Sequence, residues 1–187
     1  MAVTQPPRKQ EWMEIPQGFT GCPPGLEYLM QIDQIIIKQE VHLLEVLTGW
    51  EVANKFQILN SMGQQIYYAC EESTCLMRQC CGPSRGFKMH VTDNNQREVI
   101  SAERRFKCCA GCCWCAGSDT CAYEMPVEAP VGTECGYIRQ EFSKFSPHIK
   151  IYDHNRQPVF DIWGPCCPCQ GICCTADIDF KFRWILM

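Results

Sequence analysis

Apolar and polar residues alternate along most of this chain, a pattern that predicts β-hairpins. Three segments each consist of an alternating run, a short polar turn and a second alternating run: Phe56 to Tyr68, Phe87 to Ile100 and His148 to Trp163. The predicted turns lie at Asn60-Ser61-Met62-Gly63, Asp93-Asn94-Asn95 and Asp153-His154-Asn155. Asn, Asp and Gly favour turns. A cluster of cysteines follows each hairpin, so we expect hairpins separated by cysteine-rich loops.

Further strands are predicted outside these hairpins. Gly136 to Phe142 and Ile178 to Leu186 each begin with the same alternation. The segment Leu26 to Leu47 is ambiguous, because its isoleucines fit one helical face about as well as a strand, and we expect strands there. Long helical periodicity is absent from the second half, so the predicted fold class is all-β, a meander, sandwich or barrel.

Composition and charge narrow the class of protein. A length of 187 residues predicts about one domain, and a hydrophobic content of 46% is enough for that domain to have a buried core. Against 17 Lys+Arg stand 21 Asp+Glu, a net charge of −4, so nucleic acid is not an expected partner. The longest charge-free stretch, Ile162 to Ala176, contains two prolines and two glycines and is shorter than the roughly 18 apolar residues of a spanning helix. We therefore predict a cysteine-rich loop there.

The cysteine content indicates a reducing, cytosolic compartment. The chain has 17 cysteines, about 9% of its residues, which approaches the content of disulfide-rich secreted chains. However, the number is odd, the chain is long, and the segment Met1 to Trp12 is polar where a signal peptide is apolar. Disulfides are therefore not expected, and those within adjacent pairs would also be strained.

The spacing of the cysteines favours S-acylation over a metal site. Ten of them stand in adjacent pairs, at 80/81, 108/109, 112/113, 166/167 and 173/174. Zinc sites usually use CxxC knuckles, and only Cys109 to Cys112 forms a clean pair with that spacing, beside the related Cys112 to Cys115. A thioester needs only an exposed thiol near a membrane, and several acyl chains anchor a protein stably. A zinc or redox module built from residues 108–115 and 166–174 stays open, as does a set of inert thiols.

Residues near the central cysteine cluster fit a membrane interface. Arg104, Arg105 and Lys107 precede it, and Trp114 lies within it. Elsewhere the chemistry is sparse. The four histidines are scattered, no nucleophile, phosphate-loop, zinc-protease or EF-hand motif occurs, and Asp177 and Asp179 fit a solvated strand face. An enzyme with a catalytic side chain is not predicted.

Several separated segments resemble the phospholipid scramblases, in the order in which that family has them. They are Cys22 to Leu29, Gln31 to Ile35, Leu44 to Trp50, Cys80 to Arg85, Arg97 to Ile100, Glu128 to Gly132 and Gly164 to Cys166. The resemblance implies a Tubby-like β-barrel around a hydrophobic C-terminal helix. It divides the chain into a short polar segment, residues 1–21, and a barrel domain, residues 22–187.

The resemblance also implies a function and its sites. Members of the family move phospholipids between the two membrane leaflets in both directions. This movement is activated by Ca²⁺ and is independent of ATP. The members are membrane-associated proteins and not enzymes. The expected location of the protein is the cytoplasmic face of the plasma membrane, with a cytosolic or nuclear pool when it is unacylated. The resemblance leaves open whether the protein has protein partners at the inner leaflet and whether it forms an oligomer. The family's palmitoylation motif coincides here with Cys112, Cys113 and Cys115, where Trp114 replaces a proline and Cys108 and Cys109 add thiols.

Two family features have no counterpart in this sequence. The acidic Ca²⁺-binding segment and the hydrophobic helix follow the strand that ends near Phe180, whereas this sequence ends at Met187. We therefore expect an incomplete barrel without its central helix and no Ca²⁺ site. The alternative function is an acylated adaptor that recruits proteins to the membrane without transporting lipid.

Overall fold

The computed structural model describes residues 11–16, 18, 21–40, 52–109, 112–165 and 179–185. Over these ranges the chain forms one antiparallel sheet of ten strands, and each strand pairs with its neighbours in the sequence. The all-β prediction is confirmed. The strands are β1 (Ile36–Gln39), β2 (Lys55–Leu59), β3 (Gln65–Glu72), β4 (Phe87–Thr92), β5 (Glu98–Arg104), β6 (Glu124–Glu128), β7 (Glu134–Gln140), β8 (His148–Asp153), β9 (Pro158–Trp163) and β10 (Lys181–Trp184).

All three predicted hairpins are present, as β2 with β3, β4 with β5, and β8 with β9. The same hydrogen-bond pattern closes the turn of each hairpin. The side-chain oxygen of Asn60, Asp93 or Asp153 accepts hydrogen bonds from the backbone N–H groups two and four residues later, at 2.8 to 3.0 Å. Asn and Asp favour this local bonding, so the turns could be located from the sequence.

Helical structure appears where the sequence predicted strand or loop. The ambiguous segment divides into a 3₁₀ turn, η1 (Glu27–Met30), and strand β1, while residues 41–47 lie outside the described ranges. The first cysteine cluster forms a helix, α2 (Cys75–Cys81), so the prediction of a loop was wrong there. Thr74 caps this helix by accepting a hydrogen bond from the Met77 N–H at 3.3 Å, and good helix formers follow. Two further 3₁₀ turns are η2 (Gly82–Ser84) and η3 (Cys115–Gly117).

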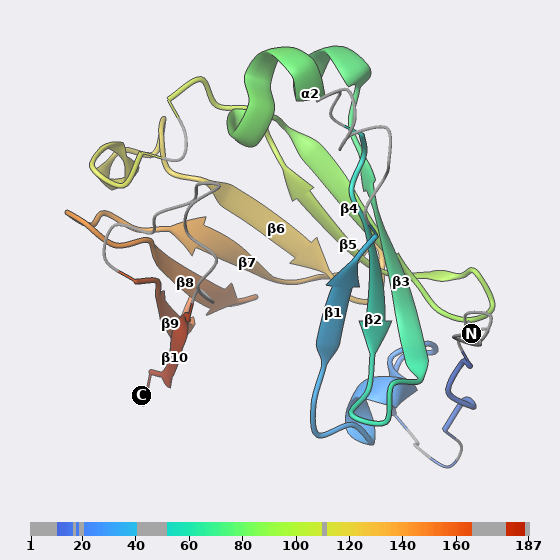
Figure 1. Ribbon diagram of the computed structural model, residues 1–187. Helices are drawn as coiled ribbons and strands as arrows, with labels where there is room; N and C mark the ends of the chain where they lie inside the picture. Colours follow the sequence, from blue (N-terminus) through green and yellow to red (C-terminus); the bar gives the residue numbers. More distant parts are fainter. Residues whose placement is uncertain are drawn as a thin grey trace, which may run out of the picture.

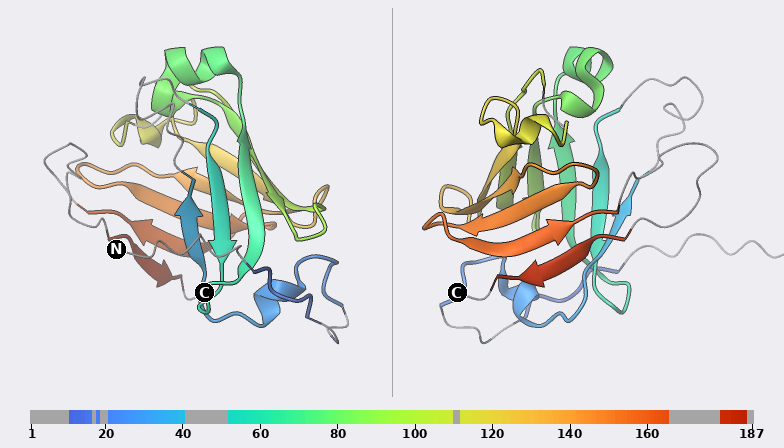
Figure 2. Two further views of the ribbon diagram at one scale, coloured as in Figure 1. Left: turned by 45° about the vertical axis from the view of Figure 1, so that its right-hand side comes forward. Right: turned by 90° about the vertical axis from the view of Figure 1, so that its left-hand side faces the viewer.

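Over the described strands the sheet is curled but not closed into the barrel that the resemblance implies. Figure 1 shows β1 to β5 on one side and β6 to β10 crossing to the other, with α2 above the ends of β4 and β5. The views in Figure 2 show the same curved sheet from two other directions. Among the described strands, β1 and β10 each pair on one edge alone, and both are mostly exposed. Alternating polarity predicts hairpins, which form between neighbouring segments. Closure of the sheet into a barrel depends on its two edge strands, which are distant in the sequence, pairing with each other.

The main buried cluster lies where η1 packs against the sheet. Tyr28, Ile66, Tyr67 and Val99 are each at most 2% exposed. The rings of Tyr28 and Tyr67 meet edge to face at 5.5 Å. The backbone near Trp12, in the segment expected to be a polar lead, hydrogen-bonds to Gln65 of β3. This cluster fixes the first half of the sheet, at a distance in sequence from the cysteine-rich loop of the second half.

Candidate membrane-attachment site

The loop between β5 and β6 presents most of the predicted acylation sites to solvent. Cys108, Cys112 and Cys115 are exposed, and Cys113 is partly buried. In Figure 1 this loop is the yellow segment at the upper left, near the connection from β7 to β8. The structure thus places all five predicted candidates in this one loop.

Cys109 forms a disulfide with Cys121, at a Cα–Cα distance of 5.1 Å. The expectation that the chain has no disulfides was therefore wrong for this pair. The sequence drew attention to bridges within adjacent cysteines, but the chain turns back at Ser118, whose carbonyl accepts from the Cys121 N–H at 3.0 Å. While the bond is present, Cys109 has no thiol for acylation. The bridge encloses Cys112, Cys113 and Cys115 in one loop and restricts that loop's freedom.

Hydrogen bonds within the loop and to the β7–β8 connection order the loop while its outer thiols stay exposed. The Lys107 ammonium donates to the carbonyls of Asp119 and Ala122 at 2.5 and 2.7 Å. The Ser143 N–H, in the connection from β7 to β8, donates to the Cys113 carbonyl at 3.2 Å. The first two bonds close the base of the loop, and the third fixes the backbone at Cys113 against the β7–β8 connection.

The surroundings of Cys112 favour its thiolate form. The backbone N–H of Cys115, the Cys115 thiol and the backbone N–H of Trp114 all stabilise the Cys112 thiolate and lower its pKa. The pKa of Cys115 is raised in turn, because its thiol donates a hydrogen bond to Cys112. Since the thiolate is the nucleophile, these pKa directions make Cys112 a better nucleophile than Cys115.

We expect Cys112 to be alkylated several-fold faster than Cys115 by limiting iodoacetamide at pH 7.5. Peptide mass spectrometry of the protein with its disulfide intact measures this ratio. Cys113 serves as the internal comparison for a partly buried thiol. Equal labelling of Cys112 and Cys115 would contradict the assignment.

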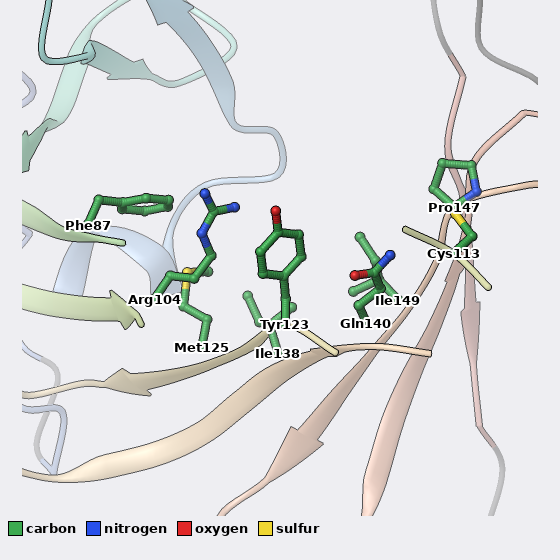
Figure 3. A pocket seen from close by; sticks show the side chains of 9 residues that line it. All are labelled: Phe87, Arg104, Cys113, Tyr123, Met125, Ile138, Gln140, Pro147 and Ile149. Atoms are coloured by element: carbon green, nitrogen blue, oxygen red, sulfur yellow. The ribbon is translucent and has the colours of Figure 1, made fainter. Parts of the chain in front are cut away.

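A cavity of about 330 Å³ lies beneath the loop, on the concave side of the sheet. Figure 3 shows the side chains that line it: Phe87, Arg104, Cys113, Tyr123, Met125, Ile138, Gln140, Pro147 and Ile149. The Arg104 guanidinium lies between two rings, 4.5 Å from the centroid of Phe87 and 4.4 Å from that of Tyr123. It also donates to the Arg85 carbonyl, and burial lowers its pKa.

The three basic residues that precede the cysteine cluster therefore have different roles. Arg104 lines the cavity and Lys107 binds backbone carbonyls, so both cations already have intramolecular partners. Arg105 is exposed. A run of like charges does not reveal which cations the fold uses internally, because that depends on rings and carbonyls from other strands.

The described part of the chain contains no group of three or more His, Cys, Asp or Glu side chains arranged to hold a metal ion. Buried carboxylates are already paired, as Glu71 is with Arg85 and Asp93 with Arg97. The residues described here thus do not fit a Ca²⁺ site. Residues 166–174, part of the zinc or redox hypothesis, lie outside the described ranges, as does Asp177.

Within the described ranges, every helix is too short or too polar to span a bilayer. The family description "Scramblase" matches residues 13–184. The chain is 45% identical over 172 residues to human phospholipid scramblase 1, covering 92% of this chain and 52% of the relative. It is 45% identical over 177 residues to bovine phospholipid scramblase 2, covering 95% and 58%.

Human phospholipid scramblase family member 5 is 40% identical over 185 residues, covering 96% of this chain and 65% of the relative. No solved structure matches. The chain spans about half to two thirds of the length of these relatives. With a family match over almost its whole length and relatives at 40 to 45% identity, the chain belongs to the scramblase family.

Proposed function

We propose that this chain is the lipid-anchored β-domain of a phospholipid scramblase, attached to the cytoplasmic face of the plasma membrane by thioesters on Cys112, Cys113 and Cys115. The observation that carries the attachment is the exposure of Cys112 and Cys115 in one loop, whose backbone is hydrogen-bonded to the β7–β8 connection. The transport function rests on family membership and on the names of the relatives.

Thioester formation at this loop requires an acyl donor of the acyl-coenzyme A class. The Cys112 thiolate attacks the donor's thioester carbonyl, a new S–C bond forms, and coenzyme A leaves as the thiol after taking up a proton. The two N–H groups that stabilise the Cys112 thiolate favour this residue as the first acceptor. A single acyl chain gives reversible attachment, so a second chain at Cys115 or Cys113 makes the anchor stable.

The transport itself is bidirectional movement of phospholipids without ATP, activated by Ca²⁺. A polar headgroup must cross about 30 Å of hydrocarbon in this process. On this proposal the anchored β-domain, with its curled sheet, lies at one leaflet. Because these residues provide no Ca²⁺ cluster, Ca²⁺ dependence is not assigned to any of them.

The attachment is tested in cells with the variant Cys112→Ser/Cys113→Ser/Cys115→Ser. We expect it to lose hydroxylamine-sensitive acylation and to move from the membrane fraction to the soluble fraction, because no chains remain to be buried. The matched control is Cys75→Ser/Cys80→Ser, which removes two exposed thiols from α2. Retained acylation and membrane association of the triple variant would refute the assigned sites.

Transport is tested with the purified acylated chain in liposomes that contain a fluorescent phospholipid. Dithionite quenches the outer leaflet, so scrambling appears as loss of the protected half of the signal, and it is measured with and without Ca²⁺. Protection equal to that of protein-free liposomes would contradict the transport function. Anchoring without transport would instead identify the chain as an acylated adaptor.

A further inference from the structure

Three exposed aromatic side chains lie on and beside the cysteine-rich loop. Trp114, Phe142 and Phe145, which we call the aromatic rim, are 62%, 50% and 62% exposed. Trp114 belongs to the loop between β5 and β6, and Phe142 and Phe145 belong to the connection from β7 to β8. Large apolar side chains that share one exposed surface mark an interaction site more strongly than scattered ones.

Direct contacts join these two segments into one surface. The rings of Trp114 and Phe145 meet edge to face, with centroids 6.3 Å apart. The Trp114 indole N–H donates to the Lys144 carbonyl at 2.7 Å. A methyl group added at Gly117 would lie 3.7 Å from the Phe142 side chain, so these residues are also neighbours. The aromatic rim therefore has a defined shape before any partner binds.

The chemistry of this surface suits the interface of a lipid bilayer. Because the indole N–H of Trp114 already has a protein partner, the exposed remainder of the ring is apolar. Trp and other amphipathic aromatics are favoured at the headgroup level of membranes. Lys144, adjacent to Phe145 in the sequence, is exposed, and its positive charge suits anionic headgroups.

The position of Trp114 relative to the thiols leads to the same partner. It stands between Cys112 and Cys115, and two residues of chain span at most about 7 Å. If both cysteines place acyl chains in the bilayer, Trp114 cannot lie far from the headgroups. We propose that the aromatic rim inserts into the interface of an anionic phospholipid bilayer and binds it before, and independently of, acylation. The proposal rests on the proposed function, since it extends the same attachment site.

On this basis attachment has two stages. The rim first gives weak, reversible binding that brings Cys112 to the membrane, where acyl donors are concentrated. Thioesters then make the attachment stable. The rim also fixes the orientation of the sheet, with the loop between β5 and β6 and the β7–β8 connection toward the lipid.

The test uses the full chain produced without acylation, with Cys112, Cys113 and Cys115 replaced by Ser so that thioesters cannot contribute. Binding is measured by co-sedimentation with vesicles of phosphatidylcholine alone or with phosphatidylserine, and by the emission of Trp114, taken as the difference from a Trp114→Phe protein. We expect binding that is stronger on the anionic vesicles, with a shift of the Trp114 emission to shorter wavelength.

Trp114→Ala/Phe145→Ala should weaken the vesicle affinity at least about tenfold, because two large side chains lose apolar contact. The matched control is Phe182→Ala/Trp184→Ala on β10, which removes the same residue types at 66% and 72% exposure. The control should bind as tightly as its parent. Thermal unfolding should be similar for both variants, since all four side chains are exposed.

Three results would overturn the proposal: no binding of the parent to either vesicle, an equal loss of affinity in the β10 control, or a rim variant that alters only self-association in sedimentation velocity. The last result would identify the rim as an interface between copies of the chain. Failure here leaves the acylation sites to be judged by the cellular experiment, and failure of that experiment leaves vesicle binding unaffected.

Discussion

Replacing Glu71 by Ala is expected to lower the free energy of unfolding by about 3–5 kcal/mol, because it leaves a largely buried guanidinium without its counter-charge. Glu71 is 7% exposed at the end of β3. Arg85 donates to both of its carboxylate oxygens, at 2.8 and 3.0 Å. Ser73 and Asn54 donate to the same carboxylate at 2.7 and 2.6 Å. One side chain thus ties β3 to the residues before β2 and to the turn after α2.

Glu71 should also make the free energy of unfolding depend on pH in the acid range. Burial by itself raises the pKa of Glu71, but the hydrogen bonds from Arg85, Ser73 and Asn54 outweigh it and lower the pKa to about 2. The folded pKa is therefore below the ordinary value of 4.5, so the contribution is complete above about pH 4.5 and is lost as the pH falls toward 2. Glu71→Gln, which has no charge to lose, should flatten this part of the pH profile.

Urea unfolding at several pH values measures both effects. The matched control is Glu72→Ala, the next residue, whose side chain is 74% exposed and pairs with His90. We expect Glu72→Ala to lower the free energy of unfolding by no more than about 1 kcal/mol, because exposed ion pairs contribute little. Similar losses in the two alanine variants would show that the buried network does not carry the stability assigned to it.

Gly25→Ala is expected to cost about 2–5 kcal/mol, from overpacking of the core and a left-handed backbone. Gly25 has φ +95°, and a Cβ atom there would lie 2.2 Å from Cγ1 of Val99. Val99 is 2% exposed and belongs to the main buried cluster. The Tyr67 hydroxyl also donates to the Gly25 carbonyl at 2.7 Å, so the backbone cannot shift without breaking a buried hydrogen bond.

Gly63→Ala separates the two causes. Gly63 has φ +80° in the turn between β2 and β3, and a Cβ atom there would meet nothing within 4 Å. It should therefore show the backbone cost alone, about 1–2 kcal/mol. Thermal unfolding of both variants gives the comparison. If Gly25→Ala were no more destabilising than Gly63→Ala, the close approach to Val99 would not be a constraint.

These positions illustrate how far sequence patterns reach. Gly25 and Arg85 both lie in segments that resemble the scramblases, so the sequence marked them as characteristic of the family. It gave no reason for either residue. The reasons are contacts with Val99 and Glu71, which are distant in the chain.

The candidate site divides in the same way. The cysteine spacing and Trp114 pointed to the loop between β5 and β6, and exposure of Cys112 and Cys115 agrees with that choice. The bridge from Cys109 to Cys121 was missed, because Cys121 stands alone in the sequence and only the turn at Ser118 brings it back. Phe145 was missed for a related reason, since nothing local places it against Trp114.

By itself the sequence determined the hairpins, their turns and the family, because alternation of polarity, Asn and Asp in turns, and motif order are all properties of neighbouring residues. Only the tertiary structure decided that the sheet stays open, that Arg104 lies inside it, and that thiols and aromatic rings meet on one rim. These features depend on pairs of segments far apart in the chain, whose meeting is set by the packing and curvature of the whole sheet.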